Sequence, residues 1–514
     1  MARAQEQVGQ ESSQSELQPQ LSNSDSELNH GSAPDTTEYS LSRAQAITAV
    51  VSLTSVSCLN TMGSGILTVA LPKMAEDLDL NRDILLWPAA VYALAAGCTL
   101  LVFGAVADAV GDKRVWLTGS ILFACFTLGC GLAQTGAQLI AFRTLLGISI
   151  SMCLPCAVSL MTRTFPPGKA RNLGFASMGV GQPIGYSIGL ILGGLFADTI
   201  GWRYGYYISA ILNAVFSGLA FWSLPREKPK AVPWLEGLKG IDWIGAPIIS
   251  VSLALLSFVL ARITESYHMI GEPYIIVLFV ISLVLLPVFV FWVERQERNG
   301  RPALIPNSIW KNTLFSATCV IVFFAWAELN ALQYFTSLYF QDVQNLSAFT
   351  SSLMFLPMIV VGAVTNVFTG FTVDKVRVGT LVFGSAILST VSPILMALVD
   401  PNWGYWRGPF FAIGLSPIHA DVLFTVSNLI ISFAYPGQNQ ALAGAVFNSV
   451  SQVGNSVGLA VSAAIAASVT DHSEQDLLKG YRAAYWLMFA SMIVVSAFSF
   501  FGLRTGGYVG KKNE

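Results

Sequence analysis

The sequence predicts an all-α protein that crosses a membrane many times. Of its 514 residues, 54% are hydrophobic and only 11% are charged, whereas an average soluble domain carries roughly 25% charged residues. The apolar residues gather in runs of about twenty, the length that a helix needs to cross a bilayer core. Lys and Arg gather in alternate connections between these runs. A chain with so few charges cannot cover a water-facing surface, so we expect a lipid-facing one.

The apolar runs define fourteen expected spans. Backbone polar groups in hydrocarbon must be satisfied within the segment, so these runs are expected to be helices. The short alternating period of a membrane barrel is absent. The spans cover approximately residues 45–70, 84–107, 115–133, 137–162, 172–197, 204–224, 242–262, 273–293, 313–340, 350–373, 379–399, 409–434, 438–469 and 482–503.

The positive charges predict the orientation, because cytoplasmic loops carry an excess of Lys and Arg. With the N-terminus in the cytoplasm, most cations fall in inner loops and in the C-terminal tail. An even number of spans then places both termini inside. The outer loops keep only Lys73, Arg82, Arg203, Arg262, Arg407, Lys479 and Arg482.

Two pairs of similar sequence segments divide the chain into halves. Gly104-x-x-x-Asp108 closes the second span, and Gly370-x-x-x-Asp374 closes the tenth. Val180-Gly-Gln-Pro-Ile-Gly185 in the fifth span resembles Val453-Gly-Asn-Ser-Val-Gly458 in the thirteenth. Repeated bundles around a central site are common in transporters. We therefore expect a disordered cytoplasmic tail at 1–43, six-helix bundles at 44–225 and 312–505, a linker with two extra transmembrane helices at 226–311, and a cytoplasmic tail at 506–514.

These motifs resemble those of the major facilitator superfamily over residues 44–505. Supporting segments are Ala70-Leu-Pro72 at the end of the first span, Asp242-Trp-Ile-Gly245 before the seventh and Leu477–Arg482 before the last. The chain is similar to the fourteen-span drug:proton antiporter group. Within it, the chain resembles a fungal branch that includes a boron and drug exporter and a low-affinity ammonium transporter. The resemblance implies the major facilitator fold, with two six-helix bundles and two inserted helices.

The segment between the second and third spans carries the most specific motif. Asp108 falls near the C-terminal end of a helix, where a carboxylate is unfavourable unless a cation or the N-terminus of another helix lies nearby. The resemblance implies a cytoplasmic latch that holds the two halves together, and the alternative is a solvated, positive-inside turn. The latch residues are Gly104, Asp108, Gly111, Lys113 and Arg114.

Several positions depart from the family pattern, and three of them bear on charge. Ala109 and Asp112 stand where the family usually has basic residues, so we expect a thinner charge network at the hinge. Gly63 stands where many relatives carry an acid in the first span. Proton coupling in this chain must therefore use other groups.

Glycines and a proline shape the fifth span. Residues four apart advance about 400° around a helix, so these glycines share one slowly drifting face that lets another backbone approach. Proline removes a helix hydrogen bond and bends the span. The pattern resembles the family's antiporter motif, and the alternative is ordinary glycine packing. The residues are Gly181, Pro183, Gly185, Gly189 and Gly193.

Few charged residues lie inside the spans. Inserting one at the bilayer centre has an unfavourable free energy of roughly 2.5–3.5 kcal/mol on insertion scales. Arg143 resembles the family arginine that is tied to proton coupling, although its long stem could instead reach outward to the membrane surface. Asp421 and Glu328 are acids in the twelfth and ninth spans, and a lone carboxylate there could carry a proton. Each acid could instead belong to a satisfied structural pair.

Neutral polar side chains mark the expected substrate cavity. The ninth span has Trp326, Asn330, Gln333 and Tyr334, and the first span has Asn60 and Ser64. Such stripes face the bundle interior, where they line a cavity or hydrogen-bond neighbouring helices.

The sequence therefore predicts a secondary transporter that works by alternating access. We expect proton-coupled export of a small organic molecule, drug or toxin across the plasma membrane, with an internal membrane such as that of the vacuole as the alternative location. The other candidate function is a facilitator or exporter of a small solute such as ammonium or borate. We expect a monomer in the lipid bilayer whose partners are its substrate and protons, without cofactor, metal, nucleic acid or enzymatic activity. A further alternative is a receptor with a transporter-like fold that binds its ligand without transporting it. A flux measurement would distinguish this receptor from a transporter.

Overall fold

A computed structural model describes residues 42–80, 87–225, 234–265, 267–434, 440–473, 476–504 and 507–508. The expected disordered tail at 1–43 lies outside the described residues except for its last two, and the closing tail at 506–514 lies outside except for residues 507–508. From Arg43 onward the chain forms one compact unit.

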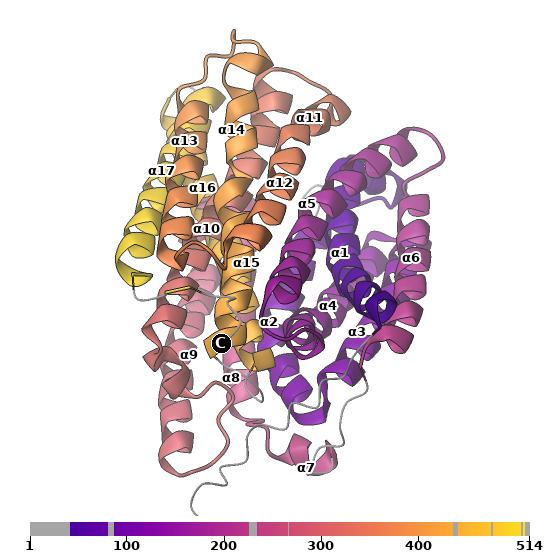
Figure 1. The fold of residues 1–514 in the computed structure, drawn as a ribbon. Helices are drawn as coiled ribbons and strands as arrows, with labels where there is room; N and C mark the ends of the chain where they lie inside the picture. The colour runs from indigo at the N-terminus through magenta and orange to yellow at the C-terminus, as the bar shows by residue number, and fades with distance from the viewer. Residues whose placement is uncertain are drawn as a thin grey trace, which may run out of the picture. The chain divides into compact units, whose positions relative to one another are not determined.

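The first six long helices pack together, and Figure 1 shows them as one indigo-to-magenta group. Helix α1 packs along α5, α2 along α4, and α3 against both α4 and α6. These helices are α1 (Arg43–Asp77), α2 (Trp87–Val110), α3 (Asp112–Leu132), α4 (Gly136–Thr164), α5 (Lys169–Asp198) and α6 (Arg203–Ser223).

A short helix and a helical pair follow. They are α7 (Trp234–Lys239), α8 (Gly245–Glu265) and α9 (Pro273–Arg298). Asp242 begins the pair, because its Oδ1 accepts the amide hydrogens of Ile244 and Gly245. Trp292 of α9 donates its indole N–H to the same carboxylate at 3.0 and 3.1 Å. One buried acid thus fixes the start of α8 and ties it to α9, while α8 also packs against α2 and α16.

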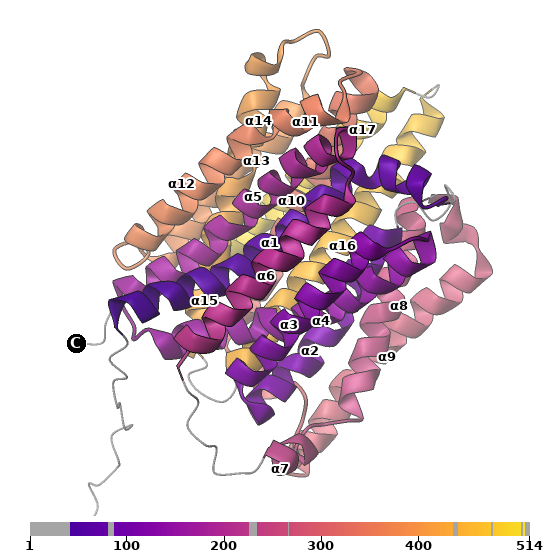
Figure 2. The ribbon, with the colours of Figure 1, turned by 90° about the vertical axis from the view of Figure 1, so that its right-hand side faces the viewer.

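The remaining helices form the orange-to-yellow group of Figures 1 and 2. Two expected spans are interrupted, at Phe355 and at Ser416. Pro357 and Pro417 stand at the following helix starts, where a missing amide hydrogen is tolerated. The helices are α10 (Thr313–Leu338), α11 (Ala348–Met354), α12 (Leu356–Thr372), α13 (Val378–Ala397), α14 (Pro409–Leu415), α15 (Pro417–Ala434), α16 (Gln440–His472) and α17 (Leu477–Gly502).

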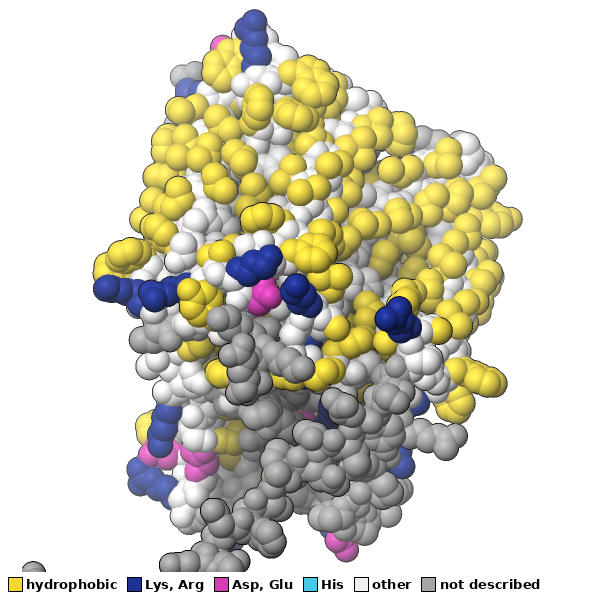
Figure 3. All heavy atoms as spheres, viewed as in Figure 1, with side chains coloured by type: hydrophobic (Ala, Val, Ile, Leu, Met, Phe, Trp, Pro, Cys, Tyr) yellow, Lys and Arg dark blue, Asp and Glu magenta, His cyan; other side chains and the backbone are white. Residues whose placement is uncertain are grey.

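Within the described residues, fourteen helical segments are long and apolar enough to cross a membrane. The prediction of an all-α, fourteen-span fold is confirmed. Apolar side chains cover most of the upper half of the face in Figure 3, and most of the visible Lys and Arg side chains lie at mid-height or below. Because consecutive spans alternate in direction, the α2–α3 connection lies on the same side as the ends of α4, α12 and α17. We call this the hinge side.

The glycine segments that are similar in the two halves, in α5 and in α16, each make a close helix–helix contact. A Cβ placed on Gly185 would meet the Cys58 carbonyl of α1, and one on Gly189 would meet the Met62 carbonyl. In the other half, a Cβ on Gly454 would meet the Phe323 carbonyl of α10, and one on Gly458 would lie 2.5 Å from Ala327 Cα. In each half the glycines therefore let the fifth helix of the bundle approach the first.

This contact predicts a large penalty for one added methyl group. Gly185→Ala should lower the stability of the purified protein by about 1–3 kcal/mol, because the methyl overpacks a backbone contact. Gly218→Ala on α6 is the matched control, since nothing lies within 4 Å of its added Cβ. Thermal melting in detergent compares the two. Equal melting temperatures would show that α1 and α5 are not in close contact.

Candidate functional site

The α2–α3 hinge brings the end of α2 to the start of α16. Gly111 adopts a φ of 121° between α2 and α3, a conformation that strongly favours glycine. Gly104 is buried one turn before Asp108. The amide N–H of Leu442, in the first turn of α16, donates to Asp108 Oδ2 at 3.2 Å. A carboxylate is favourable at this helix N-terminus, so Asp108 links the two halves.

The two hinge cations lie apart from this contact. Lys113 donates its ammonium group to the carbonyls of Phe221 at 3.1 Å and Leu224 at 2.6 Å, at the end of α6. A cation is favourable there because a helix C-terminus carries partial negative charge. The Arg114 side chain is exposed, and it makes no ion pair with the described residues.

Asp112, to which the sequence assigned no role, is the acid that the hinge buries most deeply. It is the first residue of α3 and its side chain is fully buried. Arg163 Nη2 lies 2.9 Å from its Oδ2, and Ser159 donates a hydrogen bond to the same oxygen at 2.6 Å. The expected thin charge network at the hinge thus contains a buried ion pair between α3 and α4.

A second polar link between the halves also escaped the sequence analysis. Arg171, in the first turn of α5, donates to Ser432 Oγ of α15 at 2.9 Å. The same guanidinium donates to the carbonyls of Phe165 and Thr162. Thr162 also donates to Ser432 Oγ, at 3.3 Å. Arg171 therefore fixes the α4–α5 turn and contacts the other half on the hinge side.

Asp421 lies where α5, α12 and α15 meet. A Cβ added to Gly362 of α12 would lie 2.7 Å from Asp421 Oδ2 and 3.6 Å from Pro183 Cγ of α5. Asp421 Oδ2 is buried without a hydrogen-bond partner, and no Lys or Arg of the described residues pairs with it. The Asn366 side chain interacts with the carboxyl group. The proline of the antiporter-like helix and the lone acid of the twelfth span are thus brought together.

The buried network continues from Asn366. This residue is fully buried. It donates to the Gly362 carbonyl at 3.0 Å and accepts from Thr425 at 3.3 Å. A Cβ on Gly179 of α5 would meet its amide oxygen. Polar groups of α12 and α15 therefore face α5 directly across the boundary between the halves.

His419 and Glu328 lie away from this network. His419 faces α13, where Ser385 lies 3.1 Å from its Nδ1 and Ser389 accepts its amide N–H. Glu328 of α10 is 3% exposed, and its Oε1 has no hydrogen-bond partner in the described structure. It makes no ion pair with a described cation, so it remains a second lone carboxyl group in a span.

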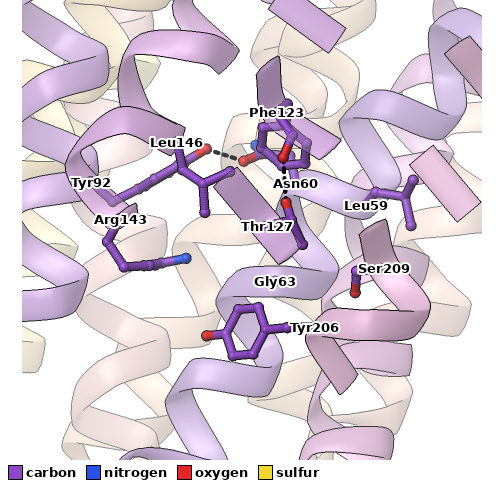
Figure 4. A pocket seen from close by; sticks show the side chains of 10 residues that line it. All are labelled: Leu59, Asn60, Gly63, Tyr92, Phe123, Thr127, Arg143, Leu146, Tyr206 and Ser209. Atoms are coloured by element: carbon purple, nitrogen blue, oxygen red, sulfur yellow. Dashed lines mark hydrogen bonds between the residues drawn. The ribbon is translucent and has the colours of Figure 1, made fainter. Parts of the chain in front are cut away.

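Arg143 is buried inside the first group of helices rather than directed to the membrane surface. Its residue exposure is 3%. Its Nε donates to the Pro88 carbonyl at 3.0 Å, and its guanidinium lies 4.7 Å from the centre of the Tyr92 ring. The Tyr92 hydroxyl donates to Asn60. Figure 4 shows these side chains around a small cavity that Gly63 also lines.

The predicted substrate-cavity residues fall into two groups. Asn60 lines the Arg143 cavity, and Ser64 donates to the Asn60 carbonyl at 3.4 Å. On α10, Asn330 is exposed, Gln333 donates to Met358 Sδ at 3.3 Å, and Trp326 and Tyr334 are partly buried. The cavity that Asn60 lines includes none of these α10 residues. Within the described residues, no cluster of His, Cys, Asp or Glu is placed to hold a metal ion.

The chain is similar in sequence to known membrane transporters. The family model of the Major Facilitator Superfamily matches residues 53–420. MFS-type transporter 1 of Pyricularia oryzae is 49% identical, over 93% of this chain and 87% of its own length. Two Saccharomyces cerevisiae proteins are also similar. The low affinity ammonium transporter is 25% identical over 79% of this chain and 78% of its own length. The aminotriazole resistance protein is 26% identical over 78% and 73%.

The fold is also similar to that of a solved structure. The human organic anion transporter MFSD10 (TETRAN) superposes with a TM-score of 0.63 and 14% sequence identity. The match covers 88% of this chain and 99% of that one. At this identity the similarity shows the fold alone.

Proposed function

Because this chain belongs to the major facilitator superfamily and is a multi-pass membrane transporter, we propose that it exports a small organic molecule in exchange for protons. The observation that carries the proposal is the position of Asp421. A carboxyl group without a charged partner is favoured in its neutral form inside a membrane, so it can take up and release a proton as its surroundings change.

Asp421 is well placed to couple protonation to movement. It borders Gly362 and Pro183, so its charge state acts on the contact between α5 and the opposite half. Pro183 weakens the α5 hydrogen-bond ladder at the same level. A charged Asp421 would attract water or polar groups into this contact, and a neutral one would let α5 close against α12. The halves would then rock about the substrate site.

The hinge contacts support a latch for one of the two states. Two hydrogen bonds join the halves on the hinge side: one between Asp108 and Leu442, and one between Arg171 and Ser432. This side also carries most of the Lys and Arg residues, which favours a cytoplasmic position for it. We therefore propose that the structure represents the transporter closed toward the cytoplasm, with both termini inside and the plasma membrane as its location.

The names of the relatives support two kinds of substrate. Resistance to aminotriazole, named for one yeast relative, agrees with export of a small polar organic compound. Ammonium, named for another, is the alternative substrate. The amide and aromatic side chains of Asn330, Gln333, Tyr334 and Trp326 suit an uncharged polar organic molecule better than ammonium, because they supply no carboxylate.

A flux assay tests the proposal directly. Proteoliposomes with an imposed pH gradient are given labelled aminotriazole or labelled methylammonium, with and without a protonophore. The proposal requires concentrative movement of an organic probe that collapses with the gradient. Equilibration of methylammonium without concentration, unaffected by the protonophore, would establish the facilitator instead.

Asp108→Asn tests the latch. The substitution keeps an acceptor oxygen but removes the charge at the α16 N-terminus, where charge and hydrogen bond together contribute about 1–2 kcal/mol. We expect a clearly slower flux with normal abundance in the membrane. Arg114→Gln is the matched hinge control and should keep wild-type flux, because the Arg114 side chain is exposed. Wild-type flux in the Asp108 variant would remove the latch from the mechanism.

A further inference from the structure

The Arg143 cavity contains more hydrogen-bond donors than the protein provides acceptors for. A guanidinium has five N–H donors. Within the described structure, Arg143 uses Nε on the Pro88 carbonyl and has no other hydrogen-bonded partner. No described carboxylate pairs with it. Its terminal nitrogens thus face the cavity without a protein acceptor, and Figure 4 shows the side chain reaching toward Gly63.

Tyr206 adds a second, independent donor. This α6 residue is 1% exposed and lines the same cavity. Its hydroxyl is buried without a hydrogen-bond partner. Buried polar groups without partners are rare in native proteins, so an orphaned hydroxyl beside a buried cation indicates an additional group between them.

The charge balance identifies the kind of group. A buried cation that lacks an opposite charge costs several kcal/mol. The Tyr92 ring face compensates part of this, because the Arg143 guanidinium lies over it at 4.7 Å and a cation is attracted to an aromatic face. Asn60 Oδ1 accepts the Tyr92 hydroxyl hydrogen, so the amide group of Asn60 is left with donors. The Thr127 and Ser209 hydroxyls also line the cavity, and each donates to a backbone carbonyl of its own helix. The cavity therefore presents a positive charge, and the donors of Arg143 and Tyr206 outnumber these two hydroxyl acceptors.

The cavity size limits the group. It holds about one water-sized group. Gly63 leaves additional room, since nothing lies within 4 Å of a Cβ placed there. An organic substrate does not fit. Chloride is somewhat larger than water, so it also needs the room that Gly63 leaves.

We propose that this cavity, between α1, α2, α3, α4 and α6, binds one small inorganic anion of the size of chloride, held by Arg143 and Tyr206. The site lies within the first helix group and away from Asp421, so the anion stabilises that group rather than entering the transport path. The proposal does not depend on the direction or the coupling of transport proposed above.

Thermal melting of the full-length purified protein tests the proposal. Sodium chloride is titrated against sodium gluconate at constant ionic strength, because gluconate is too large for the cavity. The wild-type melting temperature should rise with chloride and saturate, as binding to the native state requires. Gly63→Ala should respond more weakly, since its methyl group takes up part of the room beside Gly63.

Gly63→Asp supplies the decisive variant. Its carboxylate would occupy the free space beside Arg143 as a tethered anion. In gluconate this variant should melt at or above the wild-type temperature, and chloride should shift it no further. Arg143→Gln should lose the chloride response as well. Equal wild-type melting in chloride and gluconate would overturn the proposal. A chloride response that is unchanged in both Gly63→Asp and Arg143→Gln would do so too, because the ion would then bind elsewhere.

Discussion

Replacing Asp421 by asparagine should abolish the response of transport to a pH gradient. The amide has nearly the same shape as the neutral carboxyl group but cannot release a proton. A charge at the bilayer centre costs roughly 2.5–3.5 kcal/mol, so the membrane disfavours the ionised carboxylate relative to the neutral carboxyl group. Asparagine therefore makes permanent the form that the membrane favours, and removes the cycle of protonation. Concentrative flux should fall at least about tenfold, while exchange of labelled for unlabelled probe continues.

The measurement compares net accumulation and exchange in the same proteoliposomes over a range of pH. Wild-type protein should show a pH-dependent net flux, and Asp421→Asn a flat profile. Glu328→Gln is the matched control, since Glu328 is also a buried acid without an ion pair but lies on α10, away from Pro183. If Glu328→Gln flattened the profile and Asp421→Asn retained it, the proton carrier would be Glu328.

Much of the fold follows from local pattern. The apolar runs predict the spans because each helix must satisfy its own backbone in lipid. The boundaries are less accurate: α1 continues to Asp77, well past the apolar run that ends near residue 70. The extension carries the charged residues Lys73, Glu76 and Asp77, and Asp77 accepts a hydrogen bond from the Trp202 indole. Such a contact between distant segments leaves no trace in hydropathy.

The site was harder to predict. The spacing of residues in a helix determines which of them share a face, but it does not determine which other helix that face contacts. The glycines of α5 indicate a close helix contact, yet nothing in their spacing selects α1. The sequence allowed two positions for the Arg143 side chain: extended to the membrane surface, or buried among the helices. Its contacts with the Tyr92 ring and the Pro88 carbonyl show that it is buried. Asp112 and Arg163 are distant in the chain, so their pairing depends on how α3 and α4 pack.

The largest stability effect is expected at this pair. Arg163→Gln leaves the fully buried Asp112 carboxylate without the cation that now lies 2.9 Å from it. Breaking a buried ion pair costs about 3–5 kcal/mol. The partial positive charge at the start of α3 and the Ser159 hydroxyl still stabilise Asp112, and the Arg163 side chain is 38% exposed. We therefore expect about 3 kcal/mol, at the lower end of that range.

A double-mutant comparison separates this charge effect from lost packing. Asp112→Asn combined with Arg163→Gln should recover much of the loss, because a neutral amide no longer needs a cation. The exposed pair Lys73–Glu76 is the control: Lys73→Gln should leave stability nearly unchanged, because solvent screens an exposed ion pair. Rates of irreversible thermal inactivation in detergent measure all four proteins. If Arg163→Gln inactivated no faster than Lys73→Gln, the α3–α4 corner would not depend on the Asp112–Arg163 ion pair.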